Sequence, residues 1–322
     1  MRPSLAVIER LGVDIEWLHP PVGAAGIEQA GSAFPDEARA AIDAADATLF
    51  GATNGLSALA LFYLRWGKQT YANVRPTRFM PGASSPLASP NGIDFVIVRE
   101  NLEDMYLGVE GDLLDLAPLG LQSFTAQCPV VDLAPGAFAL KAITERGSDR
   151  VARFAFELAR RRKARGFPGR VLCAAKYNML MRSDGLFRDR VRRVAEQYPD
   201  IELQTYIVDD FARRLVAEPH SLDVVVLPNL YGDILSDAAA GLVGGLGVAA
   251  SGCYGDDYAY FESVHGSAPD IAGKNVINPT ATLLSAALLL EYLGFASAGR
   301  RLEAAIEAVY AGGSLLTPDQ RG

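Results

Sequence analysis

A short apolar run followed by an acidic helix constrains this chain more than any other feature. Val224 to Leu227 is a run of β-branched and aliphatic residues, which predicts a strand covered on both faces of a sheet. Pro228 interrupts that run, and the residues that follow it, Asn229-Leu230-Tyr231-Gly232-Asp233-Ile234-Leu235-Ser236-Asp237, predict a helix. Asp233 and Asp237 are four residues apart, so they share one helical face.

Two carboxylates on one helical face repel each other, and a helix that carries them needs something to offset that cost. The dipole at a helix N-terminus relieves part of the repulsion. A hard divalent cation such as Mg²⁺ or Mn²⁺ relieves more of it and prefers oxygen ligands. The alternative is an acidic helix start that holds no ligand, and these residues alone leave both interpretations open.

Composition and charge exclude several classes of protein. The chain has 322 residues, of which 50% are hydrophobic and 21% are charged, as expected for a soluble globular protein of two domains. A net charge of -8 argues against a nucleic acid or an anionic membrane as the main partner. The three cysteines show no metal or redox spacing, no run is long enough to span a bilayer, and the start lacks the apolar core of a signal peptide. We therefore expect a reduced, cytoplasmic chain.

Strand and helix patterns alternate along the chain. Leu5 to Leu11 predicts a helix and Val13 to Leu18 a strand, and the same alternation follows in Pro35 to Ala45 and Asp46 to Phe50. Such alternation is typical of an α/β layered fold with parallel strands.

Charged side chains stand at or near the ends of several predicted strands. Arg99 follows the strand from Ile93 to Val98, Lys176 follows a second strand and Asp209 a third, while Arg65 and Arg75 lie in a basic, aromatic segment. Ligands bind near strand ends in α/β sheets, and the arginine fork matches carboxylates. The alternative is a set of ordinary surface arginines and a lysine that extends its ammonium group into solvent.

Two glycine-rich segments have different expected roles. The run from Gly241 to Gly247 lacks the G-x-G-x-x-G spacing and follows a helix, so we assign it to close packing and not to a dinucleotide fingerprint. The stretch from Phe261 to Lys274 predicts a shaped loop in which small residues let backbone amides approach a ligand closely.

Together these segments resemble the metal-dependent β-decarboxylating dehydrogenases, the isocitrate and isopropylmalate dehydrogenase family. The resemblance runs from about Leu5 to Asp319 and is densest at Tyr71 to Pro76, Val96 to Gly108, Lys176 to Asn178 and Asn229 to Asn278. It implies an α/β, two-domain isopropylmalate dehydrogenase-like fold with a twisted mixed sheet. Residues 1–70 and 245–322 would form the cofactor-side domain, and residues 71–244 the domain for substrate, metal and dimerisation. Family members begin with a strand and a Gly-Asp-Gly-Ile-Gly-Pro-Glu turn that this sequence lacks, so we expect the N-terminal strand to be missing.

The resemblance also implies roles for individual residues. It implies that three arginines clamp the malate moiety of the substrate, namely Arg65, Arg75 and Arg99. Tyr106 would protonate the product enol, Lys176 would remove the hydroxyl proton, and three aspartates would bind Mg²⁺ or Mn²⁺, namely Asp209, Asp233 and Asp237. The adenosine site of a nicotinamide cofactor would be formed by His265, Gly266, Ser267, Ala268, Asp270 and Asn278. It further implies an obligate homodimer, in which Lys176 and Asp209 enter the active site of the neighbouring subunit.

Local chemistry narrows the cofactor and the substrate. A carboxylate at Asp270 accepts hydrogen bonds from ribose hydroxyls and repels a 2′-phosphate, so we predict NAD over NADP. The stretch from Ser57 to Leu64, just before Arg65, is mostly apolar and favours an alkyl group over a third carboxylate. We therefore predict oxidative decarboxylation of 3-isopropylmalate or a related substituted malate or tartrate, with isocitrate or homoisocitrate as the alternative.

A rival interpretation is a non-catalytic homologue with a structural or regulatory role. The missing N-terminal strand favours it. The presence of every catalytic side chain named above argues against it.

Overall fold

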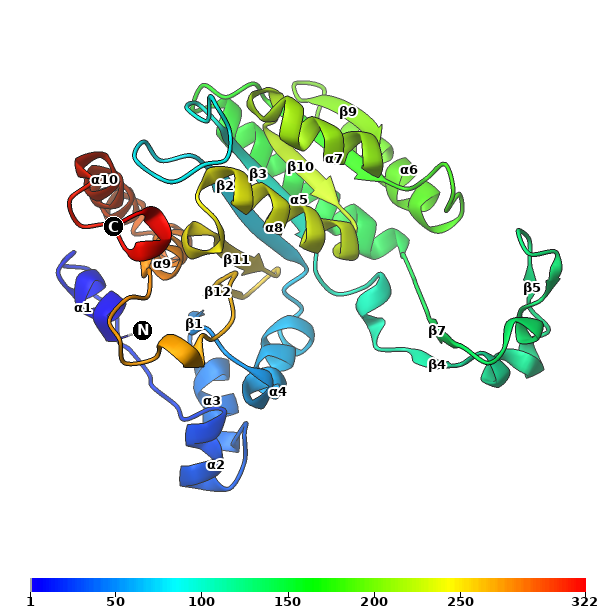
Figure 1. Ribbon diagram of the computed structural model, residues 1–322, viewed down its shortest axis with the longest axis horizontal. Helices are drawn as coiled ribbons and strands as arrows, with labels where there is room; N and C mark the ends of the chain where they lie inside the picture. The colour runs from blue at the N-terminus through cyan, green and yellow to red at the C-terminus, as the bar shows by residue number, and fades with distance from the viewer. Residues whose placement is uncertain (1) are drawn as a thin grey trace.

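An eight-stranded mixed sheet forms the centre of the computed structural model, which describes residues 2–322 (Figure 1). The strand order is β1-β12-β11-β2-β3-β10-β8-β9. The strands are β1 (Ala47–Phe50), β2 (Ala72–Arg78), β3 (Asp94–Glu100), β8 (Arg170–Ala175), β9 (Glu202–Ile207), β10 (Val224–Leu227), β11 (Ala250–Tyr254) and β12 (Ala259–Ser263). β1 pairs parallel with β12, and β3, β10, β8 and β9 run parallel, while β11 and β2 are antiparallel to both of their neighbours. The predicted α/β fold with a mixed sheet is confirmed.

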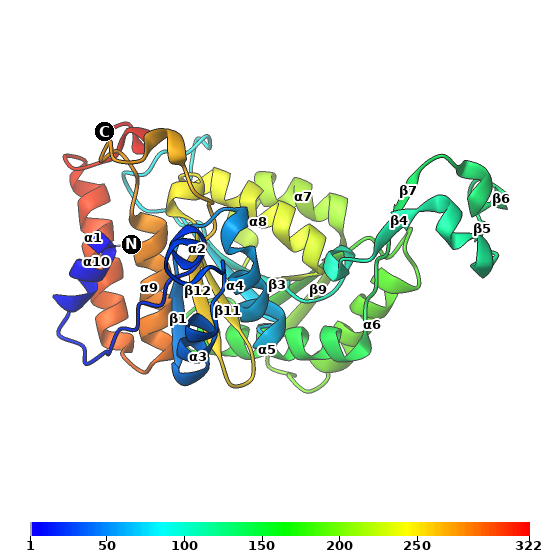
Figure 2. The same cartoon turned by 90° about the horizontal axis from the view of Figure 1, so that it is seen from below.

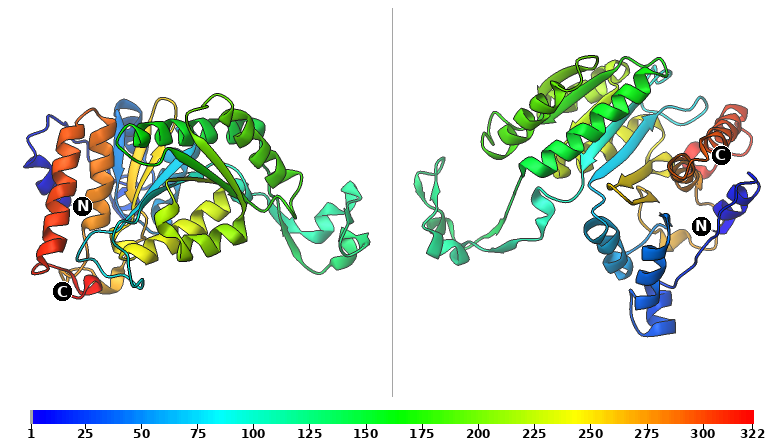
Figure 3. Two further views of the ribbon diagram at one scale, coloured as in Figure 1. Left: turned by 90° about the horizontal axis from the view of Figure 1, so that it is seen from above. Right: turned by 180° about the vertical axis from the view of Figure 1, so that it is seen from behind.

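Helices cover both faces of the parallel part of the sheet (Figure 3). α5 (Glu145–Lys163) and α6 (Ser183–Ala195) pack on one face, and α7 (Val208–Ala217) and α8 (Asn229–Val243) pack on the other. Successive residues of β10 alternate between the two layers: Val224 and Val226 join the core under α5, and Val225 and Leu227 join the core under α8. All four are fully buried, which explains the continuous apolar run in the sequence.

Helices from both ends of the chain lie at the other end of the sheet (Figure 2). These helices are α1 (Arg2–Glu9), α2 (Ala24–Ala30), α3 (Asp36–Ala44), α4 (Ala58–Phe62), α9 (Thr280–Tyr292) and α10 (Ala296–Gly312). Among them, α9 packs directly on β11 and β12, and α1 and α10 pack on α9. Within the part of the chain that the structure describes, no helix is both long and apolar enough to cross a membrane.

The strand predicted for Val13 to Leu18 is wrong. Residues 12–22 form neither helix nor strand, because β1 pairs only with β12 among the described strands and nothing pairs with this segment. Its alternation still has a structural basis, since Val13, Ile15 and Trp17 pack against the apolar core beside α9 and α10. A period of two thus indicated which side chains are buried, but not whether the backbone would join a ladder.

The sheet continues through both predicted domains. The predicted boundary between residues 70 and 71 falls just before β2, and β2 pairs with β11 of the cofactor side as well as with β3 of the substrate side. The division into residues 1–70 with 245–322 and residues 71–244 stays a prediction.

A long arm projects from the body of the molecule (Figures 1 and 3). It is formed by residues 109–140 and holds two small ladders, β4 (Glu110–Asp112) with β7 (Ala137–Ala139) and β5 (Gln122–Ser123) with β6 (Cys128–Pro129). Several apolar side chains on the arm lie in solvent, among them Phe124 at 88%, Leu119 at 65% and Leu114 at 63% exposure. Clustered exposed apolar side chains are typical of a contact surface.

Candidate active site

The carboxyl ends of β3 and β10 bring Arg99 and Asp233 together. Leu227 of β10 is paired with Arg99 of β3, so the chain enters α8 beside that arginine. The Arg99 side chain is 2% exposed, donates from Nε to Asn229 Oδ1 at 2.7 Å and forms an ion pair with Asp233. A side chain at position 232 would meet Arg99 Cβ at 2.7 Å, so Gly232 lets the helix approach this close.

Arg75, from the antiparallel strand β2, joins the two aspartates of α8. Its Nη2 donates to Asp233 Oδ1 at 3.2 Å, and its Nη1 donates to Asp237 Oδ1 at 2.9 Å. The Tyr106 hydroxyl donates to Asp233 Oδ2 at 2.9 Å. We call Arg75, Arg99, Tyr106, Asp233 and Asp237 the α8 cluster.

Burial and charge set the protonation of the α8 cluster. Burial alone would raise the pKa of Asp233, but the charges of Arg99 and Arg75 outweigh burial and lower it. Burial raises the pKa of Asp237, which faces one arginine and the repulsion of Asp233. Burial, followed by repulsion from Arg75, lowers the pKa of Arg99 to about 10. Burial and the bond to Asp233 raise the pKa of Tyr106, so its proton stays on the phenol at neutral pH.

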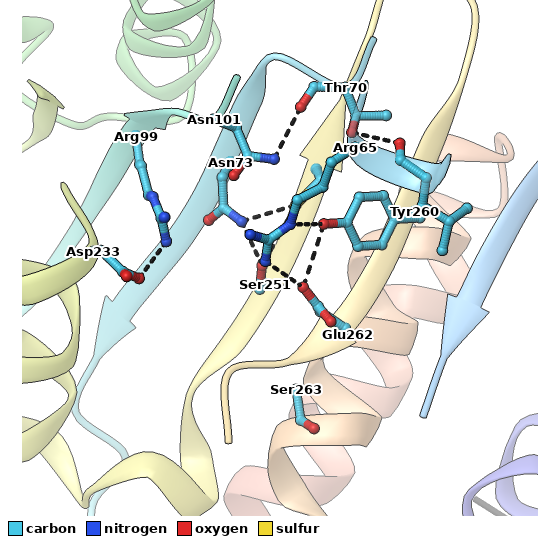
Figure 4. Close-up of polar contacts among 12 residues, drawn as sticks. Arg65, Thr70, Asn73, Arg99, Asn101, Asp233, Ser251, Tyr260, Glu262 and Ser263 are labelled. Carbon is cyan, nitrogen blue, oxygen red and sulfur yellow. Dashed lines mark hydrogen bonds and ion pairs between the residues drawn. The ribbon is translucent and has the colours of Figure 1, made fainter. Parts of the chain in front are cut away.

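Arg65 lies at the edge of this region and has different partners (Figure 4). It sits in a single π-helical turn, Tyr63–Gly67, a rare backbone form that often marks a functional position. Its Nε donates to Tyr260 Oη at 2.9 Å, and its Nη2 lies 3.5 Å from Glu262 Oε1. The structure therefore joins two of the three predicted clamp arginines directly to the acidic pair and orients the third toward β12.

Lys176 and Asp209 lie apart from the α8 cluster. Lys176 follows β8, and Asp209 is the second residue of α7, which follows β9. Their Nζ and Oδ1 atoms are 2.6 Å apart. That bond lowers the pKa of Asp209, whose side chain is 67% exposed. Within residues 2–322, no three histidine, cysteine or acidic side chains lie close enough to hold a metal ion. Within one chain, Asp233 and Asp237 lie on the same helix as a pair of oxygen donors, whereas Asp209, the third predicted ligand, lies beside Lys176.

The predicted adenosine loop begins later than expected, because Phe261 to Ser263 belong to β12 and only the residues after Ser263 form the connection beyond its carboxyl end. The Ser267 backbone N–H donates to the carbonyl of Thr53, 3.3 Å away, just after β1, the parallel neighbour of β12. The rest of the predicted set lies in the same connection to α9, namely His265, Gly266, Ala268 and Asp270. Asn278 accepts from the Thr280 N–H at 3.0 Å and donates to Asp319 Oδ2 at 2.9 Å, so it fixes the start of α9 to the C-terminal segment.

Three residues of this region were given no role on the basis of the sequence. Asn229 orients Arg99, and Tyr260 and Glu262 hold Arg65. The position of Asn229 directly after the buried strand was an available signal. Glu262 lies within the segment that was predicted as a ligand loop, but the contacts of Tyr260 and Glu262 with Arg65 depend on packing between segments far apart in sequence.

Comparison with known proteins agrees with this architecture. The family model described as "Isocitrate/isopropylmalate dehydrogenase" matches residues 4–322. The chain is 43% identical over 320 residues to the 3-isopropylmalate/3-methylmalate dehydrogenase of Methanocaldococcus jannaschii, covering 99% of this chain and 89% of that protein. It is 42% identical to the isocitrate/homoisocitrate dehydrogenase of Thermus thermophilus, covering 98% of this chain and 88% of that protein.

A solved structure has the same fold. The crystal structure of isocitrate dehydrogenase from Methylococcus capsulatus superposes with a TM-score of 0.84 at 36% identity, covering 99% of this chain and 89% of that chain. The family model and this solved structure both match nearly the whole chain. This chain belongs to the isocitrate/isopropylmalate dehydrogenase family, a family of decarboxylating dehydrogenases.

Proposed function

We propose that this protein catalyses the NAD-dependent oxidative decarboxylation of 3-isopropylmalate or a closely related substituted malate or tartrate, as a cytoplasmic homodimer with shared active sites that uses Mg²⁺ or Mn²⁺. The observation that carries the proposal is the α8 cluster. It places two cationic forks, two carboxylates and one phenol in direct contact at the carboxyl edge of the sheet.

Each member of the cluster has a chemical role suited to a 2-hydroxy acid with a carboxylate on C3. The guanidinium groups of Arg75 and Arg99 pair with Asp233 and Asp237 in one chain, and they could bind the substrate carboxylates as bidentate partners once these aspartates hold a metal ion. Tyr106 keeps its proton and can deliver it to C3 after carbon dioxide has left. A divalent cation bound by Asp233 and Asp237 would polarise the substrate hydroxyl and stabilise the negative charge that develops during decarboxylation. NAD would accept the hydride from C2.

The dimer is supported by what one chain lacks beside its α8 cluster. Lys176, the predicted base, and Asp209, the predicted third ligand, face solvent as a pair of their own. The arm carries uncovered apolar side chains, and Met181, close in sequence to Lys176, is 74% exposed. A second copy that covers these surfaces and brings its Lys176 and Asp209 to the α8 cluster would complete the site.

The substrate assignment is supported by apolar side chains beside the clamp arginines. Leu59 and Phe62 of α4 are 58% and 50% exposed. Phe62 packs edge-on against Trp66, and Trp66 Nε1 donates to the Leu102 carbonyl at 3.0 Å, four residues before Tyr106. An alkyl group on C3 would gain by covering these side chains, whereas a carboxylate would lose hydration there.

The names of the relatives support two alternatives for the C3 group. Proteins named 3-isopropylmalate dehydrogenase include that of Methanothermobacter thermautotrophicus, which is 39% identical over the whole chain. The Thermus thermophilus relative is named for isocitrate and homoisocitrate, so these acids form the second candidate class.

The deciding experiment is NADH formation with Mg²⁺ or Mn²⁺ and a panel of 3-isopropylmalate, D-malate, tartrates, isocitrate and homoisocitrate. We expect the highest kcat/KM with an alkyl-substituted malate and with NAD in preference to NADP. A preference for NADP would contradict the role given to Asp270. A folded dimer that turns over none of the acids would favour the non-catalytic alternative.

A further inference from the structure

A buried ion triad lies between the α8 cluster and the Lys176–Asp209 pair. Lys141 Nζ is 3.0 Å from Asp104 Oδ1 and 2.6 Å from Asp184 Oδ1. Both aspartate side chains are fully buried, and the lysine side chain is 13% exposed. Neither Oδ1 atom accepts a hydrogen bond from another described residue, so the two buried charges depend on their ion pairs with Lys141.

Asp104 connects the triad to Tyr106 and to α8. Its second carboxylate oxygen accepts a hydrogen bond from the Leu230 N–H at 2.9 Å, at the start of the helix that carries Asp233. Its backbone has φ 73° and ψ −136°, a region that residues with a side chain rarely occupy. Such strain persists only where the surroundings hold it, and it is concentrated at functional sites. Asp104 thus fixes the turn that presents Tyr106, two residues later, to Asp233.

Asp184 connects the triad to Lys176. It lies at the start of α6, and its second carboxylate oxygen accepts a hydrogen bond from the Lys176 backbone N–H at 2.7 Å. That bond fixes the backbone from which the Lys176 side chain extends to Asp209. Lys141 itself follows the arm and lies 4.6 Å from the ring centre of Tyr231 on α8.

We propose that Lys141 is a positioning residue that couples the two active sites of the dimer. Through Asp104 it sets Tyr106 and the start of α8 for the site of its own chain. Through Asp184 it sets Lys176, which acts in the site of the partner. One ammonium group therefore controls the geometry of one proton-transfer residue in each site. The inference rests on the shared active sites of the proposed function.

Heterodimers of defined composition test this coupling. A dimer of one Tyr106→Phe subunit and one Lys176→Met subunit contains one complete site, built from Tyr106 of the Lys176→Met subunit and Lys176 of the Tyr106→Phe subunit. Lys141→Met is then placed in either subunit. In one placement the substitution disturbs the Tyr106 of that site, and in the other it disturbs the Lys176 of that site.

We expect both placements to lower kcat by at least about tenfold, since misplacing a reacting group by a fraction of an ångström weakens proton transfer. KM for the acid should change little, because Arg75 and Arg99 do not contact the triad. Lys68→Met is the control for the loss of a paired lysine, because Lys68 Nζ lies 2.6 Å from Asp43 Oδ1, a carboxylate that is 46% exposed and belongs to neither the triad nor the α8 cluster. The control should leave kcat unchanged.

The outcomes distinguish a failure of the Lys141 coupling from a failure of the proposed shared active sites. No activity in the parent heterodimer would overturn the shared sites themselves. An active parent whose kcat is unaffected by Lys141→Met, or falls in only one placement, would overturn the coupling.

If Lys141→Met prevents folding, Asp104→Gly replaces it. Glycine removes one carboxylate and the backbone strain, while the Lys141–Asp184 pair remains. A loss of kcat is expected in the placement where the substituted subunit supplies Tyr106, and none is expected where it supplies Lys176, because the Lys141–Asp184 pair that orients Lys176 remains. An unchanged kcat in both placements would overturn the proposal.

Discussion

The α8 cluster and the Lys176–Asp209 pair differ in how completely their own chain surrounds them. Asp233 receives bonds from Arg75, Arg99 and Tyr106, and its side chain is 33% exposed. Asp209 has Lys176 as its side-chain partner and is 67% exposed. The first region is held in place by its own fold, whereas the second has few contacts within its chain. This difference supports the proposal that a second copy completes each active site.

Lys176→Met is expected to have the largest effect and to separate activity from stability. Loss of a general base lowers kcat by about 10²- to 10⁴-fold. Because the Lys176–Asp209 pair is exposed, the free energy of unfolding should change by less than about 1 kcal/mol. Steady-state kinetics and urea denaturation measure the two quantities. Substantial residual turnover would remove the base assignment.

Asp233→Asn and Asp209→Asn form a matched pair that sharpens the contrast in stability. Removing the charge of Asp233 leaves the buried Arg99 without its anion. The free energy of unfolding should fall by about 2 kcal/mol, less than the roughly 3–5 kcal/mol lost when a fully buried pair is broken, because Asp233 is partly exposed. Asp209→Asn should leave the free energy of unfolding nearly unchanged, as for other exposed pairs. Equal losses in the two variants would contradict the difference in burial.

Glu100 provides a smaller, pH-dependent test of the buried side of the comparison. It follows Arg99 and is 1% exposed, and burial raises its pKa from 4.5 to about 7. Between about pH 4.5 and about pH 7, Glu100 is therefore protonated in the folded state and ionised in the unfolded chain. This contribution to stability is fully present below about pH 4.5 and is lost as pH rises through about 7.

Glu100→Gln should remove this dependence. Between about pH 5 and about pH 7.5, wild type should lose roughly 2 kcal/mol more of its unfolding free energy than the variant does. Urea denaturation at the two pH values measures the difference. A parallel pH dependence in the two proteins would show that Glu100 is ionised in the folded state at both pH values.

The sequence predicted the parts of the site that depend on local pattern. The apolar run of β10 and the spacing of Asp233 and Asp237 predicted a strand followed by a helix with one acidic face, and the structure has both. The positions of Arg99 and Lys176 at strand ends were also visible. The closeness of Arg99 to Asp233, in contrast, depends on β3 and β10 being neighbours in the sheet, which the sequence alone did not specify.

The remaining features depend on long-range pairing. Lys141, Asp104 and Asp184 are scattered along the chain and form a triad only after the arm returns to the body. Val13 to Leu18 alternates like a strand, yet it has no neighbouring strand with which to pair. Local pattern predicts burial and element type, but the partners of a charged group follow from topology.

Subunit mixing tests most directly whether each active site is built from two chains. Tyr106→Phe and Lys176→Met homodimers should each be inactive with the substrate that the wild type prefers. After the subunits exchange, half of the dimers are mixed, and each mixed dimer has one complete site out of two. Activity should therefore rise to roughly one quarter of wild type, because each complete site contains both proton-transfer residues. Persistent inactivity, with subunit exchange verified by differently tagged chains, would contradict the account by showing that Tyr106 and Lys176 serve the same chain.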